Sequence, residues 1–200
     1  MAKSNGLKMS RQLQIYDLIA GVENGAVYGP SEVMSIFNIS QRMLQRDLKD
    51  LRDCGLINVR YDRSRDRYVV AKDVPFDDTV PIRRRQHLQR LYRIGTLIRN
   101  LSSIDPEDLM NYESELNEYN EYFEEVKDDP ENNSPEDLEY MRRFFIRNEI
   151  VFYDLKAEYY SLFPDSNERT RQRDFEEMNR AGFFIYYSRK YKSFIYEYHR

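Results

Sequence analysis

The sequence predicts a mainly helical α+β fold in which one small unit is built twice. The tripeptide Gln45-Arg46-Asp47 returns as Gln172-Arg173-Asp174, and in each copy a glycine stands nine residues after the arginine. Each copy has the pattern of a short polar helix that ends near this glycine, followed by two β-rich runs around a polar turn. An internal repeat of this kind indicates one supersecondary unit used twice.

The first copy is expected to begin with a helix from Arg11 to Val22, because its apolar residues recur on one face. A short apolar strand is expected at 26–28. Pro30 favours the first position of a second helix, since its missing N–H group needs no partner there. This second helix is expected to end near Asn38.

The third helix of the first copy is defined by its two ends. Ser40 is a natural cap for its free amide groups, and Gly55 supplies the left-handed stop. Residues 56–61 and 67–71 alternate between apolar and polar and predict a hairpin around a polar turn at 62–65. A helix, a strand, two helices and a hairpin, in this order, make the winged helix-turn-helix arrangement.

The middle of the chain is expected to contain two helices of opposite charge. The first, from Pro81 to Leu101, holds six arginines and no acidic residue, and Asp105-Pro106 opens the second. The second carries a heptad seam of apolar residues, namely Leu109, Tyr112, Leu116, Tyr119, Phe123 and Val126. This seam has two interpretations: an antiparallel hairpin in which the acidic helix packs beside the arginine-rich one, or a contact that joins two subunits into a homodimer.

The last part of the chain repeats the unit. Ser134 and Asp154 are expected to cap two helices, and Asn167 begins the copy of the third helix. Residues 183–187 and 193–198 are expected to close the unit as a hairpin. The expected segments are a winged helix-turn-helix at 8–72, a helical hairpin at 81–127 and a second winged-helix unit at 134–200.

The charge of the chain is strongly polarised. Residues 105–139 hold 15 acidic residues and one basic residue, a net charge of −14, so the remainder carries +10 although the whole chain carries −4. A basic remainder suits a nucleic-acid partner. The single cysteine, Cys54, excludes an intrachain disulfide, and no stretch resembles a signal peptide or a membrane helix. We therefore expect a cytoplasmic protein without membrane contact.

Residues 40–57, SQRMLQRDLKDLRDCGLI, resemble the winged helix-turn-helix of DeoR-type regulators, a module that also opens many WYL-domain regulators. The family pattern has a serine, an Arg-Thr pair, Arg-Asp followed by an apolar residue, and a later leucine and glycine. This chain departs from it only at Met43, where threonine is usual. The resemblance covers roughly residues 10–72. It implies a bacterial-type regulator whose third helix enters the DNA major groove.

The residues themselves predict the same interface. If the leucines of the third helix face the core, its glutamines and arginines face outward, with the geometry to pair with adenine or guanine edges. The proposed base readers are Gln41, Arg42 and Gln45, beside the cap Ser40. The proposed backbone contacts are Arg46, Lys49, Arg63 and Arg65. Arg46 has a second interpretation, an anchor held by its neighbour Asp47.

The second copy is less uniform. Arg169, Gln172 and Arg173 stand in the places of Arg42, Gln45 and Arg46, and its turn carries Arg189 and Lys190. However, Glu168 and Glu176 put carboxylates in the places of Gln41 and Lys49, so this copy has three interpretations: it contacts DNA, contacts a protein or has a purely structural role. If both copies bind DNA, one chain would hold two successive half-sites without dimerising.

The sequence thus predicts a transcriptional regulator that binds double-stranded DNA sequence-specifically. One cysteine and two distant histidines leave no zinc site, and no glycine-rich loop lies between Gly95 and Gly182, so neither an enzyme nor a cofactor is expected. Two alternatives stay open. One is a tandem winged-helix interaction module, comparable to the accessory subunits of bacterial chromosome-condensing complexes, and the other is a replication initiator.

Overall fold

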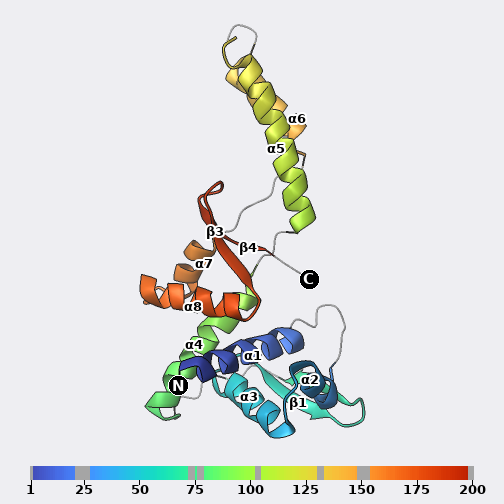
Figure 1. Ribbon diagram of the computed structural model, residues 1–200, viewed down its shortest axis with the longest axis vertical. Coiled ribbons are helices and arrows are strands. Elements are labelled where there is room, and N and C mark those ends of the chain that lie inside the picture. Colours follow the sequence, from blue (N-terminus) through green and yellow to red (C-terminus); the bar gives the residue numbers. More distant parts are fainter. Residues whose placement is uncertain are drawn as a thin grey trace. The chain divides into compact units, whose positions relative to one another are not determined.

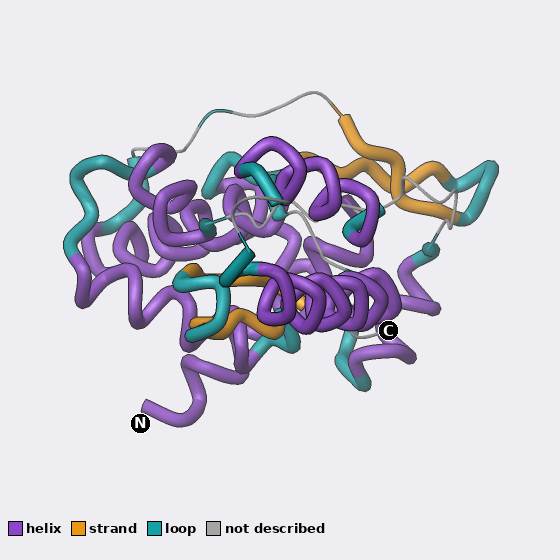
Figure 2. The backbone as a smooth tube through the Cα atoms, turned by 90° about the horizontal axis from the view of Figure 1, so that it is seen from above, coloured by secondary structure: helices purple, strands orange, loops and turns teal. Residues whose placement is uncertain are grey.

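The computed structural model describes residues 2–20, 28–71, 75, 79–101, 105–129, 133–147 and 154–197. Within these ranges, eight helices and two antiparallel hairpins form the mainly helical α+β fold expected from the sequence (Figure 1). The strands are confined to the two hairpins (Figure 2). Contacts divide the chain into two compact units. Unit 1 comprises Met1–Leu101 and Lys156–Phe183, and unit 2 comprises Ser102–Leu155 and Phe184–Arg200.

The three helices and the hairpin of the first winged-helix unit follow one another in the expected order. They are α1 (Ala2–Ala20), α2 (Pro30–Phe37), α3 (Gln41–Asp53), β1 (Asn58–Asp62) and β2 (Arg67–Ala71). The Ser40 side chain accepts a hydrogen bond from the Met43 amide and caps α3, and Gly55 has a φ of 79° just beyond it. Asn38, also left-handed, ends α2. These local signals acted as the sequence predicts.

Helix α1 begins nine residues earlier than expected. The prediction of a start at Arg11 was wrong because tertiary contacts decide where this helix begins. Met9 and Leu13 are buried, and α1 packs against α3, α4 and α8 at once. The expected strand at 26–28 lies outside the described residues except for Tyr28, whose carbonyl accepts a hydrogen bond from the Tyr68 amide of β2 at 3.1 Å.

Helix α4 (Ile82–Arg99) lies at the centre of unit 1. It packs against α1, α3 and α8 (Glu168–Arg180) and buries Leu88, Leu91 and Leu97. Asn167 caps α8 by accepting the Thr170 amide at 2.9 Å, and Gly182, with a φ of 95°, follows the helix. Helix α7 (Leu155–Leu162) precedes α8. The end signals of α8 therefore match those of α3.

In unit 2, the acidic helix α5 (Pro106–Val126) forms a hairpin with α6 (Pro135–Phe145). The Tyr119 ring lies 6.3 Å from the Phe145 ring, and the Tyr119 hydroxyl donates to the Leu138 carbonyl at 3.5 Å. The Tyr119 part of the α5 seam therefore packs against α6, while five of the six seam residues are only half-buried. Helix α4 belongs to unit 1, where its arginines bind carboxylates on α3 and α8, so packing of α5 beside α4 stays a prediction.

The second hairpin, β3 (Phe184–Ser188) and β4 (Ser193–Glu197), belongs to unit 2. It follows α8 in the chain as β1–β2 follows α3, and both hairpins pair five residues with five. The division by contact cuts across the three segments expected from the sequence. The three segments themselves stay a prediction.

Candidate nucleic-acid interface

The charges of α3 are sorted by face. Its three acidic residues, Asp47, Asp50 and Asp53, are all buried. Its four basic residues are all exposed: Arg42, Arg46, Lys49 and Arg52. The predicted base readers Gln41 and Gln45 are exposed as well. The solvent side of α3 therefore presents glutamine and basic side chains without an exposed carboxylate.

The buried carboxylates of α3 are satisfied by other helices. Arg11 of α1 donates to Asp47 at 2.7 Å, and Arg84 of α4 donates to Asp50 at 2.6 Å and to Asp53 at 2.7 Å. Burial by itself would raise the pKa of Asp50, but hydrogen bonds from Lys8 and Arg84 outweigh it and hold the pKa below its usual value. Because α1 and α4 neutralise these acids, Arg42, Arg46 and Lys49 stay available to a ligand, whereas Arg52 lies 3.6 Å from Asp53.

Arg46 is one of the residues left available. The anchor interpretation of this residue was wrong, because both oxygens of the Asp47 carboxylate receive hydrogen bonds from α1, from Arg11 and from Gln12. Among the described residues, Arg46 itself forms no ion pair. The phosphate-contact interpretation is the one that this geometry supports.

The turn between β1 and β2 exposes the predicted Arg63 and Arg65. Its shape is set by Asp62, whose carboxylate accepts hydrogen bonds from the amide and the hydroxyl of Ser64 at 2.9 and 2.7 Å. These hydrogen bonds stabilise the ionised carboxylate and lower the pKa of Asp62 below its usual value. Arg65 approaches Asp62 only to 3.9 Å. Its guanidinium therefore remains directed at solvent.

Close packing places this hairpin beside the start of α2. A side chain at Gly29 would bring a Cβ atom within 2.5 Å of the Asp66 carbonyl oxygen, so only glycine allows this approach. Asp66 itself has a φ of 47° and accepts a hydrogen bond from the Tyr61 hydroxyl at 2.7 Å. The position of the wing is thus tied to the helix that precedes α3.

On α8 the predicted Arg169, Gln172 and Arg173 are exposed, as their counterparts are on α3. Arg171, which stands where an apolar residue is usual, is buried with 3 % of its surface exposed. Its guanidinium pairs with Glu168 at 2.5 Å and lies over the Phe175 ring at 4.8 Å. Hydrogen bonds from Arg171 and Tyr160 lower the pKa of Glu168 to about 2. Arg171 is therefore an internal partner of Glu168.

The predicted residues of the β3–β4 turn have a different setting. Arg189 and Lys190 are exposed, but the Lys190 ammonium lies 3.2 Å from the Glu113 carboxylate of α5. The Tyr191 hydroxyl donates to the same carboxylate at 3.0 Å, and burial and this hydrogen bond raise its pKa. Within unit 2, the turn is thus bound to the acidic helix.

The buried acid of the repeated tripeptide is the feature that sequence reasoning missed. In α8, Asp174 accepts hydrogen bonds from Arg90 and Arg93 of α4 at 3.0 and 2.9 Å, and from the Tyr159 hydroxyl at 2.8 Å. Asp47 and Asp174 each expose 1 % of their surface. A signal was present, since carboxylates recur three residues apart in both copies, at Asp47 and Asp50 and at Asp174 and Glu177. Such spacing places them on one helix face.

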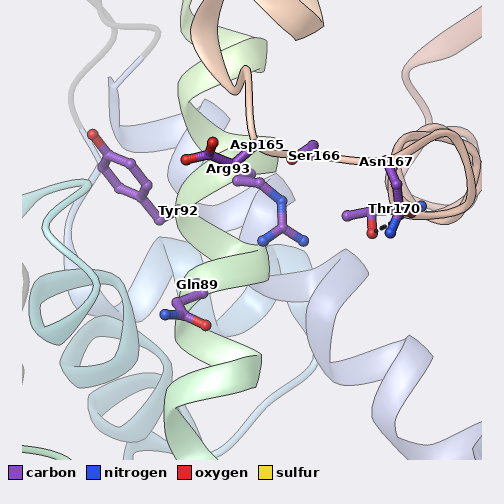
Figure 3. A pocket seen from close by; sticks show the side chains of 7 residues that line it. All are labelled: Gln89, Tyr92, Arg93, Asp165, Ser166, Asn167 and Thr170. Carbon is purple, nitrogen blue, oxygen red and sulfur yellow. Dashed lines mark hydrogen bonds between the residues drawn. The ribbon is translucent and has the colours of Figure 1, made fainter.

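A pocket of about 580 Å³ lies in unit 1 between α4 and the turn that leads into α8. Figure 3 shows Arg93 reaching from α4 toward Asn167 and Thr170 at the start of α8. Its remaining lining residues are Gln89, Tyr92, Asp165 and Ser166. Arg93 is already held by Asp174, so the pocket borders the buried ion pairs and holds no acid–base pair that could be assigned a reaction.

Nothing in the described parts of the chain groups three metal-binding side chains, and no described helix is long and apolar enough to cross a membrane. Cys54 is buried, and burial raises the pKa of its thiol to about 12, so the thiol is protonated and unreactive. Comparison of the chain with family models, curated proteins and solved structures finds no match.

Proposed function

We propose that this protein binds double-stranded DNA in a sequence-specific way and regulates transcription. The observation that carries the proposal is the sorting of charge on α3, where three acids are buried and four bases are exposed. On a helix with evenly mixed charge, carboxylates would repel the phosphates on either side of the groove. On α3, the carboxylates are bound by α1 and α4 instead.

The proposal assigns two kinds of contact. Gln41, Arg42 and Gln45 read base edges in the major groove, where a good bidentate contact discriminates by about 1–3 kcal/mol. Arg46, Lys49, Arg63 and Arg65 bind the phosphate backbone, which gives affinity without sequence preference. The wing contributes because its Asp62-stabilised turn exposes two arginines in the same unit as α3.

Selection from a randomised duplex library, followed by anisotropy titration of the selected sequence, tests the proposal. We expect enrichment of a defined motif and an affinity that falls steeply with salt concentration, because bound phosphates release counterions. Binding to all sequences alike would leave only non-specific binding. No binding at low salt would remove the proposal.

A tandem winged-helix interaction module is the second candidate, and the acidic hairpin favours it. Glu113 of α5 binds both Lys190 and Tyr191, so acidic side chains of α5 already serve as protein contacts in this chain. Copurification with a basic partner protein in the absence of DNA would support this candidate. Assembly of two chains through α5 and replication initiation stay predictions. Light scattering tests the first, and enrichment of origin sequences in the library of bound fragments tests the second.

A further inference from the structure

The two copies of the third helix, α3 and α8, are joined through their first helices. In the first copy, Lys8 and Arg11 of α1 bind Asp50 and Asp47 of α3 at 2.6 and 2.7 Å. The second copy repeats this pattern at the same spacing, because Arg90 and Arg93 of α4 bind Glu177 and Asp174 of α8 at 3.5 and 2.9 Å, respectively. Helix α4 is therefore the first helix of the second copy. The α5–α6 hairpin is an insertion between that helix and α7.

The packing of α1 and α4 is reciprocal. Helix α4 also binds the opposite copy, since Arg84 holds Asp50 and Gly95 packs closely against Leu56 beyond the end of α3. Helix α1 also binds α8, where Gln14 donates to the Ala181 carbonyl at 3.0 Å. Both first helices thus contact both third helices, and all four belong to unit 1.

Helical geometry shows on which sides the two third helices lie. With 3.6 residues per turn, Arg90 and Arg93 point about 160° away from Arg84 and Gly95 around α4. On α1, Ser10 and Gln14 contact α8. They point about 130° away from the mean direction of Lys8, Arg11 and Gln12, which hold α3. Helices α3 and α8 therefore lie on opposite sides of the α1–α4 pair. In Figure 1 they are seen below and above α1.

The exposed faces of α3 and α8 consequently point away from each other. This arrangement overturns the expectation that one chain holds two successive half-sites on one duplex, because a straight duplex can lie against only one of the two faces. Wrapping one short duplex around the α1–α4 pair would need a sharp bend, and bending a short duplex is costly because DNA is stiff over about 150 base pairs.

The face of α8 has the side chains of a second, weaker DNA contact. Arg169, Gln172 and Arg173 are exposed at the places of the α3 readers. Its exposed carboxylates have partners on the same helix, since Glu168 binds Arg171 and Glu176 lies 3.6 Å from Arg180. Arg169 and Arg173 have no ion-pair partner in the described part of the chain.

We propose that a single chain joins two separate DNA duplexes, one bound by α3 with the β1–β2 turn and a second bound by the exposed face of α8. This inference rests on the proposed function of α3. The second duplex is bound through its phosphates with little sequence preference, because α8 carries Glu176 where α3 carries Lys49.

The test uses the full chain, a bead-bound duplex that carries the selected motif, and a labelled duplex of unrelated sequence. We expect the beads to capture the labelled duplex only when the protein is present. We also expect two duplexes per chain in light scattering, with the free protein at the mass of a monomer. Arg169→Ala with Arg173→Ala should abolish capture and leave anisotropy binding of the motif duplex unchanged. Arg143→Ala with Arg147→Ala, which removes the same charge from unit 2, should change neither.

Each contrary result has a distinct meaning. One duplex per chain without capture, while the motif duplex still binds, overturns the second contact and leaves the proposed function intact. If capture survives the α8 double variant and requires dimers, the two duplexes are joined by two copies of α3, one in each chain. That result also overturns the inference. Failure of the motif duplex to bind overturns both proposals together.

Discussion

Replacing Asp174 by alanine should destabilise unit 1 far more than replacing its neighbour Arg173. Asp174 is buried and accepts hydrogen bonds from two arginines and from the hydroxyl of Tyr159, whereas Arg173 is exposed. Removing one partner of a buried ion pair costs about 3–5 kcal/mol. The Tyr159 hydroxyl would lose its acceptor as well, at about 1–3 kcal/mol for an unsatisfied buried group.

Because the side chains of Arg90 and Arg93 are 27 % and 22 % exposed, water can hydrate part of each freed charge and lower the combined cost. We therefore expect Asp174→Ala to cost about 4–5 kcal/mol, near the upper end of the range for a buried ion pair. Asp47→Ala should cost less, about 3 kcal/mol, because Arg11 and Gln12 are its only partners among the described residues. Arg173→Ala should stay within about 0.5 kcal/mol of the parent protein, as surface substitutions usually do.

Urea unfolding followed by circular dichroism measures these differences. With a urea dependence of about 1–3 kcal/mol per molar, a loss of about 4 kcal/mol lowers the midpoint by more than 1 M, which is readily resolved. The reasoning would be refuted if Asp174→Ala unfolded at the midpoint of the parent, or if Arg173→Ala proved the more damaging change.

Three further predictions follow from the site and its surroundings. Arg42→Ala should relax sequence preference by about 1–3 kcal/mol at one base position. Arg65→Ala should instead weaken binding to all sequences and reduce the slope of log affinity against log salt concentration by about 1. Equal losses on every sequence from Arg42→Ala would contradict its base-reading role. Burial, and then the charge of Lys8, lower the pKa of His87 below its usual 6.5. The folded protein therefore favours the neutral ring, and the stability of the fold should decrease as the pH drops below 6.5. His87→Gln should remove this part of the pH dependence in urea titrations, and an unchanged dependence would count against it. Cys54, with a pKa of about 12, should react with a thiol reagent only after unfolding, and rapid labelling of the folded protein would show that the thiol is accessible.

Local signals account for the elements that sequence reasoning placed well. Ser40 and Asn167 cap their helices, and Gly55 and Gly182 adopt the left-handed conformation that ends them. Each of these outcomes depends on a few neighbouring residues and on backbone sterics, so a short stretch of sequence contains the cause. The outward direction of Gln41 and the other readers of α3 followed from the leucine pattern for the same reason.

The sequence by itself determined the repeated order of helices and hairpin, the basic solvent side of α3, and the acidic character of α5. Only the tertiary structure decided which charges are buried. Asp47 and Asp174 are partnered by Arg11 and Arg93, 36 and 81 residues away in the chain. No local pattern names partners at such distances, because burial of a charge is stable only where another helix brings a donor to it. The opposed faces of α3 and α8 have the same origin, since they depend on which sides of α1 and α4 the two helices occupy.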